Sequence, residues 1–137
     1  MYAAGRPHPL RESCRTINEL ALGSPVAFCT DAEVLQELLH RYLAIDRRSE
    51  AERIVTSFAV LLEGRVIDVL ADDVVEASRL AFALPSLSAR DLLHVAILRR
   101  AGVGHIISAD RAFDAVPGLQ RLDPTELPAI RALATAP

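Results

Sequence analysis

The sequence predicts an α/β fold in which an open, mainly parallel sheet is covered by helices on both faces. Short strand-like runs alternate with longer stretches whose apolar residues recur at helical spacing. Capping residues, glycines and prolines delimit most of these stretches. Hydrophobic residues make up 51% of the 137 residues, which is enough to build the core of one domain. We therefore expect a single domain over residues 1–137.

The first part of the chain predicts two helices separated by a strand. Apolar residues recur at helical spacing over 10–22 until Gly23 ends the helix. The run 26–29 is apolar and predicts a buried strand. Thr30 and Glu33 form a capping box for the second helix. The apolar stripe of that helix comprises Val34, Leu35, Leu38, Leu39, Tyr42 and Leu43.

A third helix and a second strand follow. Ser49 and Glu52 repeat the capping pattern and predict a helix over 50–62, which ends at Gly64. The β-branched and apolar run 66–70 then predicts a strand.

The next helix begins at Asp72 or Asp73, because carboxylates favour helix N-termini. Pro85 prevents its continuation. Its expected inward face comprises Val74, Val75, Ala77, Leu80, Ala81 and Leu84.

The following helix is the most strongly marked in the sequence. Ser88 can cap it, with Asp91 at its third position. The run 92–101 is apolar on nearly every face, which predicts a buried helix. Gly102 ends it.

The last part of the chain adds two strands, a helical turn and a helix. His105–Ser108 predicts a strand, and Asp110 follows where this strand gives way to a helical turn over 111–116. A weak strand over 119–122 and a short helix after Pro128 complete the predicted elements.

Four acidic residues are candidates for a metal site, although each has an ordinary explanation. Asp91 completes a capping box, and Asp110 can cap the turn after a strand. A parallel sheet, however, brings the helix starts that follow its strands to one edge. Carboxylates gathered there would repel one another without a cation, and their hard oxygens suit Mg²⁺ or Mn²⁺. The four lie within about two turns of a helix start and are Glu37, Asp91, Asp110 and Asp114.

Glu33 is the alternative to Glu37. Both lie toward the polar side of the helical wheel, and Glu33 also has a cap to make. The spacing alone leaves this choice open.

Composition restricts the function classes. A net charge of −3 provides no overall field toward nucleic acid or membranes, so such binding must rely on local charge. The sequence has neither a signal peptide nor an apolar run of about 18 residues, which predicts a soluble, cytoplasmic protein without a membrane partner. Cys14 and Cys29 lack metal-ligand spacing. We expect buried thiols, with a disulfide as the alternative.

Three segments carry a resemblance to a known family. Residues 89–96 read ARDLLHVA, residues 107–114 read ISADRAFD, and residues 32–38 read AEVLQEL. The first two resemble the acidic motifs of the second half of a PIN domain, the fold of small metal-dependent ribonucleases that includes VapC-like toxins. The third resembles the segment whose last Glu is an acid of that family, which selects Glu37.

The resemblance implies a function and a site. It implies cleavage of RNA phosphodiesters dependent on Mg²⁺ or Mn²⁺, with Glu37, Asp91 and Asp110 as catalytic metal ligands and Asp114 as a further ligand. The metal would activate water for in-line attack and neutralise the leaving oxygen. It also implies a homodimer and a cognate antitoxin, whose Arg would pair with the acids.

Neighbouring residues have less specific roles. Arg90 and Arg111 flank two of the acids and are candidates for contacts to phosphate, with a solvated surface as the alternative. Ser108 is a candidate for orienting a ligand. We interpret His94 as a core residue rather than a general base.

The N-terminus departs from the family pattern. Family members begin with a strand ending in Asp, whereas this sequence starts at Met1–Ala4, within the apolar helix that follows that strand. We therefore expect an N-terminally incomplete domain that lacks the first strand and its acid.

Two other functions remain open. One is a catalytically impaired PIN-like module for binding or dimerisation. The other is a structure-specific DNA nuclease, whose larger insertions this compact chain lacks.

Overall fold

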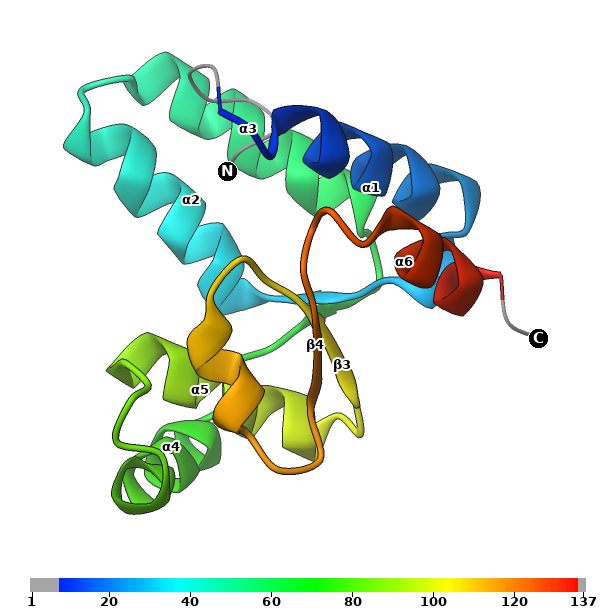
Figure 1. The fold of residues 1–137 in the computed structure, drawn as a ribbon. Coiled ribbons are helices and arrows are strands. Elements are labelled where there is room, and N and C mark those ends of the chain that lie inside the picture. The colour runs from blue at the N-terminus through cyan, green and yellow to red at the C-terminus, as the bar shows by residue number, and fades with distance from the viewer. Residues whose placement is uncertain (1–7, 136–137) are drawn as a thin grey trace. The chain divides into compact units, whose positions relative to one another are not determined.

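The computed structural model describes residues 8–135, which contain six α-helices and short strands, as expected for an α/β fold (Figure 1). The chain divides into two compact units. The first unit is assigned to the ranges Met1–Val66 and Pro124–Pro137. The second unit is Ile67–Asp123. The single domain over 1–137 stays a prediction, and Met1–Ala4 lies outside the described residues.

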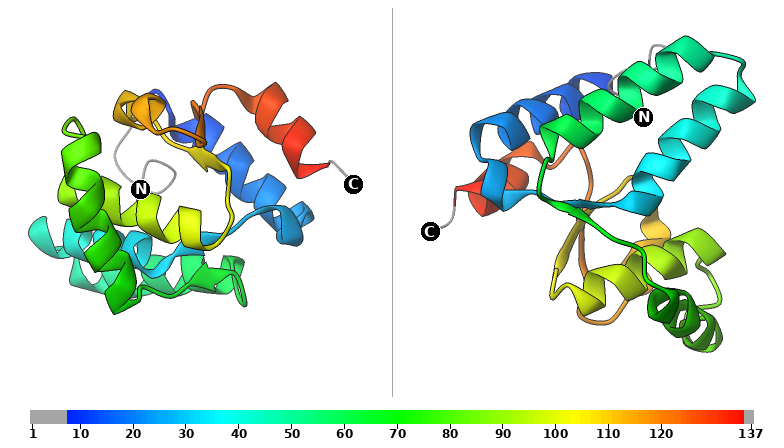
Figure 2. Two further views of the ribbon diagram at one scale, coloured as in Figure 1. Left: turned by 90° about the horizontal axis from the view of Figure 1, so that it is seen from below. Right: turned by 180° about the vertical axis from the view of Figure 1, so that it is seen from behind.

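The first unit is mainly helical. Helix α2 packs against α3, and α1 packs against α6 (Figure 1 and Figure 2). Of the predicted stripe on α2, Leu38 and Tyr42 are buried, whereas Leu39 and Leu43 are exposed. The elements are α1 (Arg11–Gly23), a 3₁₀ turn η1 (Pro25–Ala27), β1 (Thr30–Asp31), α2 (Ala32–Ala44), α3 (Arg48–Leu61) and α6 (Leu127–Ala134).

The buried strand predicted over 26–29 is wrong. A 3₁₀ turn occupies Pro25–Ala27, and Val26 is 94% exposed. Pro25 has the fixed φ of a turn and no N–H for a strand ladder. Extended pairing begins later, where the Thr30 N–H donates to the Arg65 carbonyl at 3.0 Å.

Two predicted caps are also wrong. Asp31 rather than Thr30 caps α2, with Oδ1 accepting from the Val34 N–H at 3.0 Å. Thr and Asp both suit an N-cap, and the Glu33 that favoured Thr30 does not decide which oxygen reaches the helix. Helix α3 begins at Arg48 without a side-chain cap, and Arg47 pairs with Glu50 in its first turn.

The second unit carries most of the predicted acids. Strands β3 and β4 pair in parallel, with Ile106 opposite Arg121 and Ile107 opposite Leu122. This confirms the predicted parallel pairing, although the strands are shorter than expected. The elements are β2 (Val66–Ile67, which starts at the end of the first unit), α4 (Ala71–Ala83), α5 (Ala89–Arg100), β3 (His105–Ile107), a 3₁₀ helix η2 (Arg111–Ala115) and β4 (Gln120–Leu122).

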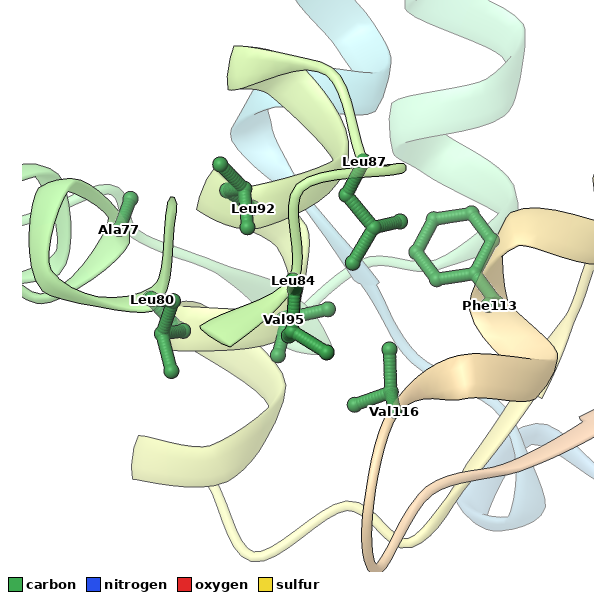
Figure 3. Close-up of a cluster of buried hydrophobic side chains, with 9 residues drawn as sticks. Ala77, Leu80, Leu84, Leu87, Leu92, Val95, Phe113 and Val116 are labelled. Carbon is green, nitrogen blue, oxygen red and sulfur yellow. The ribbon is translucent and has the colours of Figure 1, made fainter. Parts of the chain in front are cut away.

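A single apolar cluster holds this unit together. Helix α4 packs against α5, and Figure 3 shows Phe113 and Val116 facing Leu87 and Leu84. The predicted burial of α5 is confirmed for most of 92–97, including His94 at 7% exposure, whereas Arg99 and Arg100 at its end are exposed. The buried members of the cluster are Ala77, Leu80, Leu84, Leu87, Leu92, Val95, Ala96, Phe113 and Val116.

The predicted inward face of α4 needs correction. Val74 and Val75 are 54% and 48% exposed, whereas Asp73 is 2% exposed. Asp73 lies on the same helical stripe as the buried Ala77 and Leu80. An ion pair with the side chain of Arg100, described below, compensates the charge of this buried carboxylate.

The remaining expectations concern cysteines and membranes. Cys14 and Cys29 are both free, so the disulfide alternative is wrong. Cys14 is half-buried and Cys29 exposed, so neither is fully buried, although partial burial raises the pKa of each thiol. Between residues 8 and 135, no helix is long and apolar enough to span a bilayer.

Candidate metal-binding site

Asp91 lies in the first turn of α5, within the predicted capping box. Its Oδ2 accepts from the Ser88 N–H at 3.0 Å and from the Ser88 hydroxyl at 2.6 Å. The Asp91 N–H in turn donates to Ser88 Oγ at 3.3 Å. Asp91 is half-buried, and these bonds hold its carboxylate in place. Both bonds that the carboxylate accepts in the cap go to Oδ2, and none goes to Oδ1.

Asp110 has a similar position before η2. Its Oδ1 accepts from the Ala112 N–H at 2.8 Å, and its own N–H donates to Ser108 Oγ at 3.1 Å. Ser108 therefore holds the backbone of Asp110. Asp110 is exposed, and its cap uses one carboxylate oxygen.

Asp114 lies within η2 and is paired with an arginine. Arg121 Nε donates to Asp114 Oδ1 at 2.6 Å, and Nη2 donates to Oδ2 at 3.3 Å. Arg121 Nη1 donates to the Ser108 carbonyl at 2.8 Å and lies 3.5 Å from Asp123 Oδ2. The bond to Asp114 raises the pKa of Arg121. We call residues 108–114 the acidic turn, and Arg121 with Asp114, Ser108 and Asp123 the Arg121 cluster.

The two units contribute different predicted acids. Glu37 is half-buried on α2 of the first unit, as is the rejected alternative Glu33, while Asp91, Asp110 and Asp114 belong to the second unit. Within residues 8–135, neither unit by itself groups three His, Cys, Asp or Glu side chains that could hold a metal ion.

The chemistry of the acids nevertheless fits a hard cation. Asp91 and Asp110 each have one oxygen engaged in a cap and present the carboxylate at the surface or close to it. Mg²⁺ and Mn²⁺ take such oxygen ligands and keep several waters. Arg90 and Arg111, the predicted phosphate contacts, are both exposed.

Sequence reasoning missed the arginines that bind acids in the second unit. Besides Arg121, Arg100 binds Asp73, with Nε to Oδ1 at 2.7 Å and Nη2 to Oδ2 at 2.9 Å. Arg100 Nη2 also donates to the Asp68 carbonyl at 2.6 Å, and the Leu70 N–H donates to Asp73 Oδ2 at 2.8 Å. These four residues are the Arg100 cluster. The sequence did contain one signal for the Arg100 cluster, because Asp73 lies on the same helical stripe as the apolar residues Ala77 and Leu80.

The Arg100 cluster borders a pocket in the second unit. The pocket has a volume of about 430 Å³ and contains none of the four predicted acids. The hydrogen bond from Arg100 is the main cause that lowers the pKa of Asp73. The pocket is lined by Asp72, Asp73, Val75, Glu76, Arg79 and Arg100.

Comparisons with known proteins identify the family. Residues 1–119 match the PIN domain. The chain is 36% identical over 122 residues to Ribonuclease VapC13 of Mycobacterium tuberculosis, which covers 89% of this chain and 92% of that protein. It is 41% identical over 110 residues to Ribonuclease VapC23 of the same species, which covers 80% of this chain and 86% of that protein. No solved structure matches the chain. With most of its length matched in both comparisons, the chain belongs to the PIN-domain family.

Proposed function

We propose that this protein is a Mg²⁺-dependent endoribonuclease toxin that cleaves RNA phosphodiesters. The observation that carries the proposal is its similarity to proteins named VapC ribonucleases over 80–89% of the chain. The exposed or half-buried carboxylates of Asp110 and Asp91 support the proposal, because each cap uses only one oxygen.

Glu37, Asp91 and Asp110 are the proposed metal ligands. Asp114 would join them only by loosening its contact with Arg121. A bound Mg²⁺, or Mn²⁺ in its place, supplies activation of water and charge neutralisation at the phosphate. The Ser88 and Ala112 contacts keep Asp91 and Asp110 in place for this role.

The proposed substrate contacts come from arginines beside the acids. Arg90 lies on α5 next to Asp91, and Arg111 lies on η2 next to Asp110. Both are exposed and carry guanidinium groups, which bind phosphate through paired N–H donors. Ser108 acts indirectly, by accepting a hydrogen bond from the backbone of Asp110.

The proposed partners and setting follow from the same family. The protein would act in the cytoplasm as a homodimer, neutralised by a cognate antitoxin. An antitoxin Arg placed against the carboxylates would compete with the metal for the same oxygens. Competition between purified antitoxin and Mn²⁺, measured by calorimetry, tests this part of the proposal.

The first test of the metal site replaces Asp91 or Asp110 with Asn. Because Asn keeps a side-chain oxygen for each cap, we expect both variants to fold. Cleavage of a single-stranded RNA should fall about 100-fold or more, with weaker Mn²⁺ binding, because a charged ligand is lost. Asp72→Asn is the matched control, since Asp72 is an exposed acid in the first turn of α4.

The outcomes separate the alternatives. Cleavage at the parent rate by Asp91→Asn and Asp110→Asn would contradict the metal assignment. A parent protein that binds no Mn²⁺ and cleaves no RNA would favour the catalytically impaired binding module, a reading consistent with the lack of a three-residue metal group within either unit over residues 8–135. Preferential cleavage of branched DNA would favour the DNA nuclease.

A further inference from the structure

We propose that Arg121 is the positioning residue of the acidic turn: it fixes the backbone that carries Asp110, and it takes Asp114 as its counter-ion rather than leaving it as a metal ligand. The part of this inference that concerns metal rests on the proposed function. The part that concerns the turn itself can be tested without metal.

The contacts of Arg121 bracket Asp110. At the start of the acidic turn, its Nη1 donates to the Ser108 carbonyl at 2.8 Å. At the end of the turn, its Nε donates to Asp114 Oδ1 at 2.6 Å. One planar guanidinium therefore joins both ends of the segment that contains Asp110.

The Arg121 side chain is itself largely buried. Arg121 lies opposite Ile106 in the parallel β3–β4 pair, and its side chain is 10% exposed. On the other side of the turn, Phe113 is buried at 4% exposure in the apolar cluster. A side chain held by its own strand and by buried packing can transmit its position to the residues that it binds.

Asp114 differs from Asp91 and Asp110, the other two predicted metal ligands of this unit, in how its oxygens are used. Arg121 contacts both of them, at 2.6 and 3.3 Å. The caps of Asp91 and Asp110, by contrast, each use one oxygen. A metal ion at Asp114 would compete with a guanidinium that is already in place, which favours the counter-ion role.

Charge does not oppose this arrangement. The single positive charge of Arg121 faces the carboxylates of Asp114 and Asp123, at 2.6 and 3.5 Å. One cation and two anions sum to −1, so the Arg121 cluster does not present a net positive charge to a cation at Asp110. The arginine can therefore order the turn without repelling the metal.

The first experiment compares Arg121→Gln and Arg121→Lys with Arg100→Gln. Hydrogen exchange of the Asp110 and Ala112 amides is measured in metal-free protein, because both amides bond within the acidic turn. We expect about tenfold faster exchange in both Arg121 variants, since an ammonium cannot span both contacts as the planar fork does. Arg100→Gln removes an equivalent fork elsewhere in the unit and should leave these amides unchanged. Unchanged exchange in both Arg121 variants would overturn the inference.

The second experiment measures Mn²⁺ binding by calorimetry, at a temperature where circular dichroism shows each variant folded. We expect the Mn²⁺ dissociation constant to rise about tenfold in the Arg121 variants, as for the loss of an outer partner of a metal ligand. Asp114→Asn should change it by less than about threefold, and Asp110→Asn by more than tenfold. If Arg121→Gln does not fold, Arg121→Lys and Asp114→Asn decide.

The results distinguish the two proposals. If Asp114→Asn weakens Mn²⁺ binding as much as Asp110→Asn does, Asp114 is a ligand and the inference is wrong. If Arg121→Lys lowers thermal stability but leaves Mn²⁺ affinity and amide exchange unchanged, Arg121 has only a structural role, and the inference is again wrong. If Asp110→Asn binds Mn²⁺ as tightly as the parent, the proposed function fails, whereas the exchange data still judge the role of Arg121 in the turn.

Discussion

The Arg100 and Arg121 clusters use the same chemistry in two different settings of one unit. In each, a guanidinium binds both oxygens of an aspartate and donates to a backbone carbonyl, of Asp68 in one and Ser108 in the other. The aspartates differ in burial, because the side chain of Asp73 is 2% exposed and that of Asp114 is 53% exposed.

This difference in burial assigns different roles to the clusters. Asp73 lies on the apolar stripe of α4 and also accepts from the Leu70 N–H, so its cluster joins the start of α4 to the end of α5. Asp114 lies at the surface, where solvent weakens an ion pair. The Arg121 cluster therefore positions the acidic turn and adds little to the free energy of unfolding. The same bonds can thus serve packing or site geometry, depending on what they connect.

The largest expected effect concerns the buried packing beneath the acidic turn. Phe113→Ala should lower the free energy of unfolding by about 3–4 kcal/mol, because it removes a buried ring from the apolar cluster. Urea denaturation measures this value. Phe82→Ala is the control, since Phe82 is 93% exposed and its loss should change stability by no more than about 0.5 kcal/mol. Similar losses in both variants would contradict the assigned core.

The second prediction compares the two aspartates directly. Asp73→Ala should cost about 2 kcal/mol, because it leaves the Leu70 N–H and the Arg100 guanidinium without this partner. Asp114→Ala should cost about 0.5 kcal/mol. Equal losses in urea denaturation would show that burial does not separate the clusters.

The smallest expected effect concerns pH. The hydrogen bond from Arg100 lowers the pKa of Asp73 in the folded protein. Its carboxylate therefore stabilises the fold at pH values above the unfolded pKa of about 3.9, and this contribution is lost as pH falls through the lower folded pKa. Asp73→Asn should lose less stability than the parent between pH 5 and pH 3 in urea titrations. If the free energy of unfolding of Asp73→Asn falls as steeply with pH as that of the parent, other carboxylates cause the acid sensitivity.

Local patterns in the sequence predicted the elements around Asp91 and Asp110 well. The Ser88–Asp91 capping box and the Gly102 stop of α5 are confirmed. These features depend on residues within a few positions of one another, or on a run of apolar residues, so the sequence contains the relevant information.

Prediction failed where neighbouring residues offered equivalent choices. Asp31 and Thr30 both suit an N-cap, and only the folded helix shows which oxygen reaches the Val34 amide. Val74 and Val75 suit a buried face as well as Ala77 does, but packing of α4 against α5 turned Asp73 inward instead.

The sequence by itself determined the α/β class, most helices and the acids from which a metal site is proposed, because helical periodicity and capping act over a few residues. Tertiary structure alone decided which arginine binds which acid. Arg100 and Asp73 are separated by 27 residues, and Arg121 reaches the Ser108 carbonyl across 13 residues. Such contacts depend on how α4, α5 and the β3–β4 pair fold together, and no local pattern encodes that arrangement.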